Sequence, residues 1–125
     1  MKKSLLILAF CFAAIFNLSA QEKPTFMLVT TIESVVGGGF GRSKMIITKE
    51  DGSQEERDME NLFSLTGMNL KNIKSNENNI LQVLKSYTDA GWKLESAIPL
   101  TLSPGQGGAG IFMTRYLLVK AEGGK

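Results

Sequence analysis

The chain has 125 residues, of which 14 are lysine or arginine and 12 are aspartate or glutamate, so its formal net charge is +2. This length is enough for one small domain. There is no histidine and only a single cysteine, which excludes histidine-dependent catalytic triads and the usual histidine and cysteine zinc sites.

The first twenty residues have the order of a secretory signal peptide. Lys2 and Lys3 give a basic start, residues 5–16 form an uninterrupted apolar run, and Ala20 supplies the small residue that precedes a cleavage site. The apolar run is too short to cross a bilayer core of about 30 Å. We therefore expect cleavage near Ala20 and Gln21 and export to the periplasm or the extracellular medium.

The predicted mature domain covers residues 21–125. Removing the two leader lysines leaves 12 basic residues against 12 acidic ones, so no basic surface favours a nucleic-acid partner. Cleavage also removes Cys11, and the exported domain must then be stable without disulfide bonds. A lipid anchor on Cys11 is disfavoured because the bulky Phe10 precedes it in the middle of the apolar run.

The first half of the mature domain predicts two or three strands. Residues 26–36 are rich in β-branched side chains, and residues 44–49 resume this pattern after the glycine-rich segment 37–41, which predicts a hairpin. Residues 50–53, Glu-Asp-Gly-Ser, predict a turn because Asp-Gly readily adopts positive φ. The polar residues 54–60 are either a third strand at the sheet edge or a surface loop.

Residues 76–90 predict an amphipathic helix with an apolar stripe at spacings of three and four. The stripe consists of Ile80, Leu81, Val83, Leu84, Tyr87 and Ala90. Ser75 or Asn76 could cap its start, and Gly91 follows as the residue that ends the helix in the left-handed conformation. The preceding segment, residues 61–74, is expected to cover one end of the core and could include a short helical turn.

Two long strands are predicted after the helix. Residues 92–102 alternate in polarity, which predicts one face toward the core. That face consists of Trp92, Leu94, Ser96, Ile98, Leu100 and Leu102. Pro99 has no N–H to donate, so this strand lies at an edge or is bulged there. Residues 111–120 are apolar on both faces, which predicts a central strand.

A helix followed by Gly-Trp-Lys-Leu and a hairpin resembles a small bacterial family that is known as a domain of unknown function. Its members end a helix with Gly-Trp-Glu-Leu-Val and close with two strands. The matching positions are Leu84, Gly91, Trp92, Leu94 and the strand at residues 112–119, which cover roughly the last third of the chain. Lys93 stands where the family has an acidic residue. The resemblance implies a fold and no activity.

Two glycine-rich segments have patterns that bear on nucleotide binding. Residues 105–110 match G-x-G-x-x-G, but a strand follows them where dinucleotide binding needs a helix whose N-terminus holds the pyrophosphate. Residues 37–41 lack the Gly-Lys-Ser/Thr ending of a phosphate-binding loop. Both segments are interpreted as hairpin turns without a cofactor. Phe40 and Gln106 are weak candidates for contact with a partner.

Six acidic residues cluster in the middle of the chain: Glu50, Asp51, Glu55, Glu56, Asp58 and Glu60. The calcium-loop spacing is absent and Lys49 and Arg57 interleave, so a solvated strand edge is favoured over a metal site. Nothing in the sequence selects two of these carboxylates for glycoside hydrolysis. Arg115 in the last strand is a further weak binding candidate. Trp92 is interpreted as a core residue before a ligand platform.

The predicted fold is α+β, with an antiparallel sheet of four or five strands packed on one main helix in the order β-β-(β)-α-β-β. We expect a small exported domain that binds an unidentified protein or small ligand and catalyses nothing, without a metal or cofactor. Two alternatives stay open: a self-associating structural subunit that uses the sheet face away from the helix, and a small carboxylate-based hydrolase. Contiguous exposed apolar residues on that second face would favour association.

Overall fold

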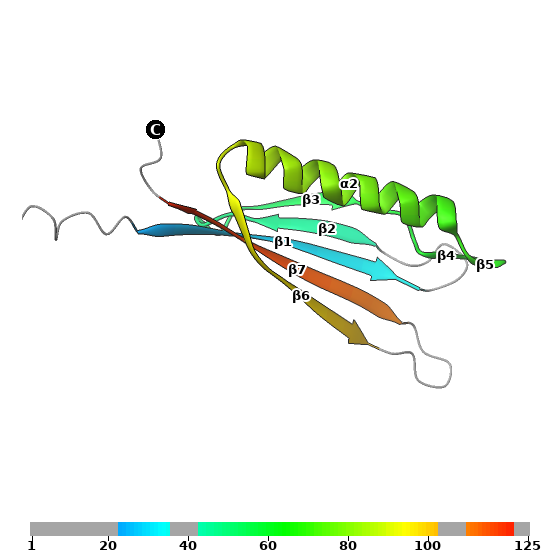
Figure 1. Ribbon diagram of the computed structural model, residues 1–125. Coiled ribbons are helices and arrows are strands. Elements are labelled where there is room, and N and C mark those ends of the chain that lie inside the picture. Colours follow the sequence, from blue (N-terminus) through cyan, green and yellow to red (C-terminus); the bar gives the residue numbers. More distant parts are fainter. Residues whose placement is uncertain (1–22, 36–42, 103–109, 122–125) are drawn as a thin grey trace, which may run out of the picture.

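The computed structural model describes residues 23–35, 43–102 and 110–121. In chain order the elements are β1 (Pro24–Ser34), β2 (Lys44–Thr48), β3 (Gln54–Asp58), β4 (Phe63–Ser64), β5 (Gly67–Met68), α2 (Leu70–Asp89), β6 (Lys93–Leu102) and β7 (Ile111–Ala121). The helix α2 covers one face of the main sheet, and the small β4–β5 hairpin lies at the start of the helix (Figure 1). The opposite face of the sheet, away from α2, is called the open face below.

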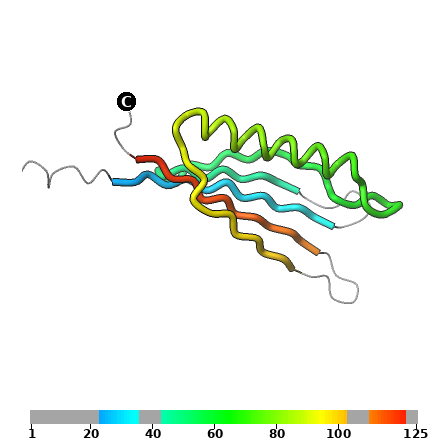
Figure 2. The backbone as a smooth tube through the Cα atoms, in the orientation of Figure 1, coloured from blue at the N-terminus to red at the C-terminus, as the bar shows by residue number. Residues whose placement is uncertain are grey.

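The five long strands form one antiparallel sheet in the order β3-β2-β1-β7-β6, which confirms the predicted α+β fold. The path of the chain through this order can be followed in Figure 2. β7 lies between β1 and β6, as its apolar character on both faces predicts. The polar residues 54–58 form a strand at the sheet edge, which decides between the two alternatives for this segment.

The core lies between α2 and the inner face of the sheet. Its buried apolar residues are Met27, Val29, Met45, Ile47, Met59, Val83 and Leu118. Most of them alternate along β1, β2 and β7, because every second strand residue points to the same face. Leu84 and Trp92 are partly buried and pack against this cluster, whereas Leu94 is 49% exposed.

The helix is longer than its apolar stripe predicts. It begins at Leu70, and the Asn69 side chain caps it by accepting hydrogen bonds of 3.2 and 3.3 Å from two backbone N–H groups of the first turn. The predicted cap at Ser75 or Asn76 is therefore wrong, since both residues lie inside the helix. Residues 61–74 were expected to cover one end of the core and to include at most a short helical turn. In the structure, the β4–β5 hairpin lies within this segment, and residues 70–74 form the first part of α2.

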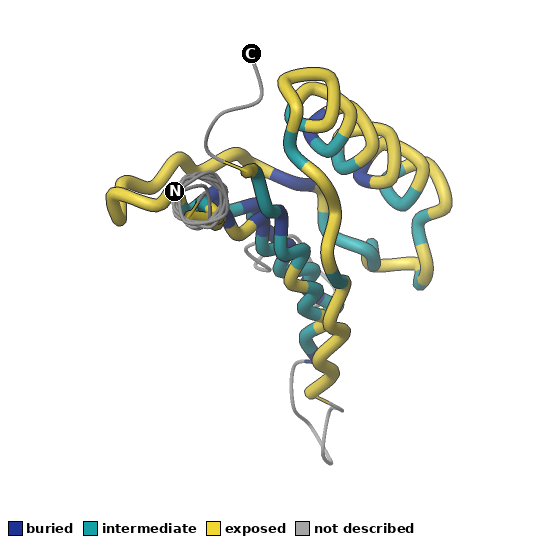
Figure 3. The backbone as a smooth tube through the Cα atoms, turned by 60° about the vertical axis from the view of Figure 1, so that its left-hand side comes forward, coloured by how far each residue is buried: buried dark blue, intermediate teal, exposed yellow. Residues whose placement is uncertain are grey.

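β6 lies at the edge of the sheet, as Pro99 predicts, but its faces differ from the prediction. Leu94 lies opposite Leu118 of the inner face, and a β-bulge then adds Glu95 to this strand. The residues that follow on the open face are Ser96, Ile98, Leu100 and Leu102. The prediction that residues 92–102 share one core face is therefore wrong, and every residue of β6 except Ser96 is exposed (Figure 3).

The turn predicted at residues 50–53 is confirmed. Gly52 has a φ of +80°, and the Lys49 N–H donates to the Ser53 carbonyl at 2.9 Å, which closes the connection between β2 and β3. The Asp51 carboxylate accepts a hydrogen bond from the Ser53 N–H at 2.9 Å. Hydrogen bonds from the side chain and backbone of Ser53 hold the pKa of Asp51 below its ordinary value.

The predicted helix end at Gly91 is also confirmed. Gly91 has a φ of +90°, its N–H donates to the Thr88 carbonyl at 3.0 Å, and the Trp92 N–H donates to the Tyr87 carbonyl at 3.1 Å. These two bonds form a Schellman motif, which satisfies the last free carbonyls of the helix. The Lys120 ammonium adds a 2.9 Å hydrogen bond to the Ala90 carbonyl.

Replacing Gly91 with alanine should lower the free energy of unfolding by about 1 kcal/mol. The new Cβ would meet only the Lys120 side chain, at an ordinary contact distance of 3.6 Å, so the cost comes from the backbone conformation. Gly91→Asn should cost less, because asparagine tolerates the left-handed conformation better than alanine. Urea unfolding of the three proteins measures the difference, and an equal cost for both variants would contradict the backbone explanation.

Candidate functional site

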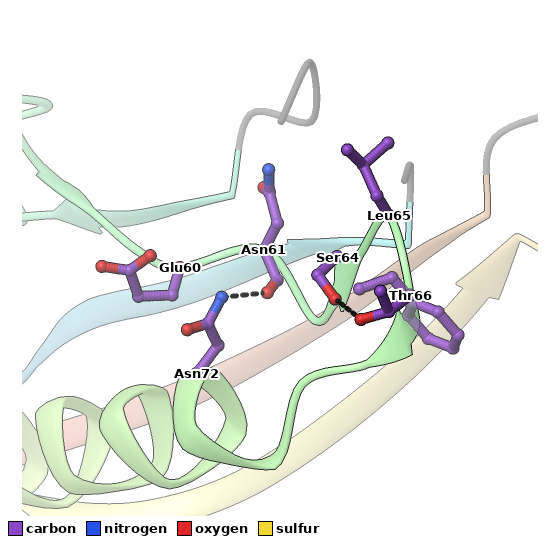
Figure 4. Close-up of a pocket in the computed structure, with 7 residues that line it drawn as sticks. Glu60, Asn61, Ser64, Leu65, Thr66 and Asn72 are labelled. Carbon is purple, nitrogen blue, oxygen red and sulfur yellow. Dashed lines mark hydrogen bonds between the residues drawn. The ribbon is translucent and has the colours of Figure 1, made fainter. Parts of the chain in front are cut away.

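A hollow of about 430 Å³ lies beside the β4–β5 hairpin (Figure 4). It is lined by Glu60, Asn61, Phe63, Ser64, Leu65, Thr66 and Asn72. Its polar groups bind one another: Asn72 Nδ2 donates to the Asn61 carbonyl at 2.8 Å, and the hydroxyls of Ser64 and Thr66 lie 3.0 Å apart. Glu60 is the only ionisable residue of this lining. The hollow therefore has no convergent set of groups that could activate a nucleophile or transfer a proton.

Asn76 is a buried polar residue whose role the sequence pattern did not indicate. Its side chain is fully buried. Its Oδ1 accepts from the Glu60 N–H at 2.9 Å, and its Nδ2 donates to the Glu60 carbonyl at 2.8 Å and to the Glu33 carboxylate at 3.0 Å. Because the amide is satisfied by the protein itself, Asn76 fixes the segment after β3 to the helix and to β1, and is not available to a ligand.

The acidic residues of β3 lie on an exposed strand. Lys44 Nζ lies 2.9 Å from Asp58 Oδ1 and 3.5 Å from Glu56 Oε2. The hydrogen bond to Asp58, followed by the charge attraction of Asp58, raises the pKa of Lys44. Glu56 and Asp58 thus share one lysine on an open strand, unlike the enclosed carboxylate pair of a glycosidase. Across residues 23–35, 43–102 and 110–121, no group of three or more acidic or cysteine residues is placed to hold a metal.

The open face carries many apolar side chains across four of its strands. They are Phe26, Leu28, Ile32, Ile46, Ile98, Leu100, Leu102, Ile111, Met113, Leu117 and Val119, placed by the strand pairing. The most exposed are Leu102 at 63%, Ile98 at 50% and Phe26 at 49%. One helix can cover only one face of a sheet, and no described element lies over this face (Figure 1). Contiguous apolar surface of this kind marks interaction sites.

One end of the open face is hollowed. A depression of about 330 Å³ lies where β1 and β7 meet the turn between β2 and β3. It is lined by Phe26, Met27, Leu28, Thr48, Lys49, Glu50 and Leu117. A shallow apolar depression with a charged rim is typical of a surface that receives a side chain of another protein.

Arg115 is the one weak binding candidate that the structure places on the open face. The strand register sets Ile98, Arg115, Thr30, Ile46 and Glu56 side by side in one row across all five strands, called the Arg115 row below. Arg115 is exposed, and within the described part of the chain its guanidinium takes part in no ion pair or hydrogen bond. Among the described residues it is therefore a cation without an ionic partner, and it lies between apolar side chains of the open face.

The other weak candidates, Phe40 and Gln106, lie outside the described residues, as do residues 37–41 and 105–109 of the glycine-rich segments. Trp92 was predicted to be a core residue, and in the structure it is partly buried and packs against the core. A sheet face away from the helix was predicted as the surface of the self-association alternative, but its residues were not identified, although the apolar character of both faces of β7 was a signal for them. In the ranges that the structure describes, no helix has the combined length and apolar character that crossing a bilayer requires.

No protein-family model matches this chain, and no curated protein or solved structure matches it either. The resemblance to the Gly-Trp family therefore stays a prediction. The functional argument depends on the open face and on the position of Arg115 within it.

Proposed function

We propose that this protein is a small exported interaction domain that binds a partner through its open face and catalyses no reaction. The observation that carries this proposal is the exposed apolar surface that extends from Phe26 on β1 to Leu102 on β6. Removing apolar surface from water stabilises a complex by about 25 cal/mol per Å² before the costs of association. A partner that covers this face would gain that contribution.

The two edges of the sheet support binding by the face instead of binding by an added strand. β3 presents charged side chains along one edge, with an ion pair of 2.8 Å between Arg57 and Glu55. β6 presents Pro99, which cannot donate to a neighbouring strand, and a bulge. Charges, proline and bulges are the features by which natural sheets prevent strand addition.

The composition supports binding over catalysis. The mature chain would lack histidine and cysteine, which supply most nucleophiles and general bases at neutral pH. The ordered polar groups considered above, including the amide of Asn76, bind each other. The proposed export is supported by the order of a basic start, an apolar run and a small residue in residues 1–20.

Replacing Leu100 with lysine should reduce association through the open face by at least about tenfold, because a charge would have to be buried in an apolar contact. Leu81→Lys is the matched control. Leu81 is 65% exposed on the helix, and Leu100 is 43% exposed on β6. The full-length protein is expressed and cross-linked in the compartment where it accumulates. It is then purified, and native mass spectrometry measures the mass of the cross-linked species.

The expected result is a cross-linked particle larger than one chain in the wild type and in Leu81→Lys, and a single chain in Leu100→Lys. Thermal melting of the purified variants checks that both remain folded. A wild type that is found only as a single chain, or an equal loss of the particle in both variants, would overturn the proposed use of the open face.

A further inference from the structure

We infer that the β4–β5 hairpin is a membrane-contact site whose apolar tip enters the headgroup region of an anionic phospholipid bilayer. This surface is separate from the open face, so the inference does not rest on the proposed function. Three features of the hairpin carry it: the exposure of the tip, the hydrogen bonds within the hairpin, and two lysines at its base.

The tip of the hairpin is apolar and exposed. It projects past the first turn of α2 (Figures 1 and 2). Leu65 in its turn is 88% exposed, Met68 on β5 is 62% exposed, and Leu70 at the start of α2 is 63% exposed. The Leu65 side chain points away from Asn72 and the helix (Figure 4). These side chains gain little burial from folding, and they gain it when the tip enters an apolar medium.

The polar groups of the hairpin bind one another. Ser64 pairs with Gly67 across the hairpin, and the Asn69 N–H donates to the Leu62 carbonyl at 2.9 Å. The Ser64 hydroxyl donates to the Gly67 carbonyl at 3.2 Å and lies 3.0 Å from the hydroxyl of Thr66. Unpaired polar groups are costly to transfer out of water. These hydrogen bonds therefore lower the cost of inserting the tip into a lipid interface.

The base of the hairpin is basic. Residues 61–76 contain two lysines, Lys71 and Lys74, and no acidic residue; the flanking acids are Glu60 and Glu77. Both lysines are exposed, and within the described part of the chain neither side chain takes part in an ion pair. The negative potential of an anionic membrane surface attracts lysines that lie close to it. The charge of this end of the molecule is thus complementary to lipid phosphates.

The size of the hairpin fits contact with a membrane interface. Leu65 lies three residues beyond Leu62 at the base, which corresponds to about 10 Å at about 3.3 Å per residue. Segments that lie in a membrane interface bury their apolar groups to a depth of about 5–10 Å. Lys71 and Lys74 follow the base of the hairpin, so their ammonium groups can stay at the level of the headgroups.

The open face fits a lipid surface less well than the hairpin does. The Arg115 row places a cation in the middle of that face, and burying an unpaired cation in hydrocarbon is costly. In the hairpin, by contrast, the apolar residues form the tip and the lysines lie behind it. This order matches the order of acyl chains and phosphates in a bilayer.

Co-sedimentation of the purified protein with lipid vesicles tests the inference. The full-length sequence is expressed, and any leader that the protein retains is the same in every variant. The wild type should bind vesicles of phosphatidylglycerol and phosphatidylcholine. Leu65→Ser should bind them about tenfold more weakly, because it removes an apolar side chain from the tip. Leu81→Ser is the matched control, since Leu81 is 65% exposed on α2, and it should bind like the wild type.

The two lysines are tested by a double variant, Lys71→Gln with Lys74→Gln. It should bind the anionic vesicles at least about tenfold more weakly than the wild type, and its binding to vesicles of phosphatidylcholine alone should not change. Lys85→Gln is the control, because Lys85 lies farther along the same helix, where it pairs with Asp89 at 2.6 Å. The replaced side chains are all exposed, so unchanged melting temperatures should show that lost binding is not unfolding.

Tryptophan emission reports which part of the molecule meets the lipid. The emission of Leu65→Trp should shift to shorter wavelengths on anionic vesicles, because an indole at the tip would enter the membrane interface. The emission of Leu81→Trp should not shift. Trp92 is present in both variants and packs against the core, so it contributes the same background to both.

Three results would overturn the membrane contact. The first is a wild type that does not sediment with anionic vesicles. The second is a Leu65→Ser variant that binds as well as the wild type or as weakly as Leu81→Ser. The third is binding that is lost in Leu100→Ser and kept in Leu65→Ser, which would place the membrane on the open face.

Discussion

Replacing Leu118 with alanine is expected to lower the free energy of unfolding by about 3–5 kcal/mol. Leu118 is 0% exposed and lies on the interior strand β7, opposite Met27 of β1 and Leu94 of β6. The two neighbouring strands fix the backbone on both sides, so the structure cannot collapse into the cavity that the smaller side chain leaves. The lost burial and the remaining cavity then add to one another.

Leu117→Ala is the control for this substitution, since Leu117 is the next residue of the same strand and points to the open face. It is only partly buried, so its truncation should cost less than half as much as that of Leu118 in the folded monomer. Guanidinium unfolding of both variants and the wild type, at one dilute protein concentration, measures the two values. A cost for Leu117→Ala that equals or exceeds that for Leu118→Ala would mean that the inner face is not the core.

Replacing Asn76 with alanine is expected to lower the free energy of unfolding by about 2–4 kcal/mol. The substitution removes three hydrogen bonds of 2.8 to 3.0 Å, two to the backbone of Glu60 and one to the carboxylate of Glu33. The backbone groups of Glu60 and the carboxylate of Glu33 then lose the amide that they bind, at a position where the Asn76 side chain is fully buried. The segment after β3 then loses its attachment to the helix.

Asn78→Ala provides the comparison, because Asn78 is exposed on the same helix and its replacement should change stability by no more than about 0.5 kcal/mol. Hydrogen exchange gives a second and more local measurement. The Glu60 amide, which donates to Asn76 in the wild type, should lose its protection in Asn76→Ala and keep it in Asn78→Ala. Unchanged protection at Glu60 would contradict the anchoring role of Asn76.

The sequence by itself determined the class of fold and most of its elements. Period-two alternation and β-branched residues predict the strands, because a sheet face accepts every second side chain. Gly52 and Gly91 predict a turn and a helix end, because their positions require positive φ, and both have it. The apolar stripe of residues 80–90 predicts a helix on the sheet. Each of these signals is local, so neighbouring residues suffice to reveal it.

The start of the helix was decided by contacts between distant segments. An asparagine is a good cap, and Asn76 precedes the apolar stripe, so a cap there was the natural prediction. In the structure its amide is held by Glu60, 16 residues earlier, and by Glu33, 43 residues earlier. These partners make a buried interior position favourable for a polar side chain, and no local pattern reports them.

The faces of β6 were likewise decided by the tertiary structure. The alternation of Leu94, Ile98 and Leu100 is regular in the sequence, but the extra residue at Glu95 reverses the direction of every later side chain relative to the sheet. The bulge arises from pairing with β7 and places Leu100 on the open face. The open face depends further on where the single helix packs, because α2 can bury only one side of a sheet whose central strands are apolar on both sides. The interaction surface and the row that contains Arg115 therefore emerge only when the five strands are assembled.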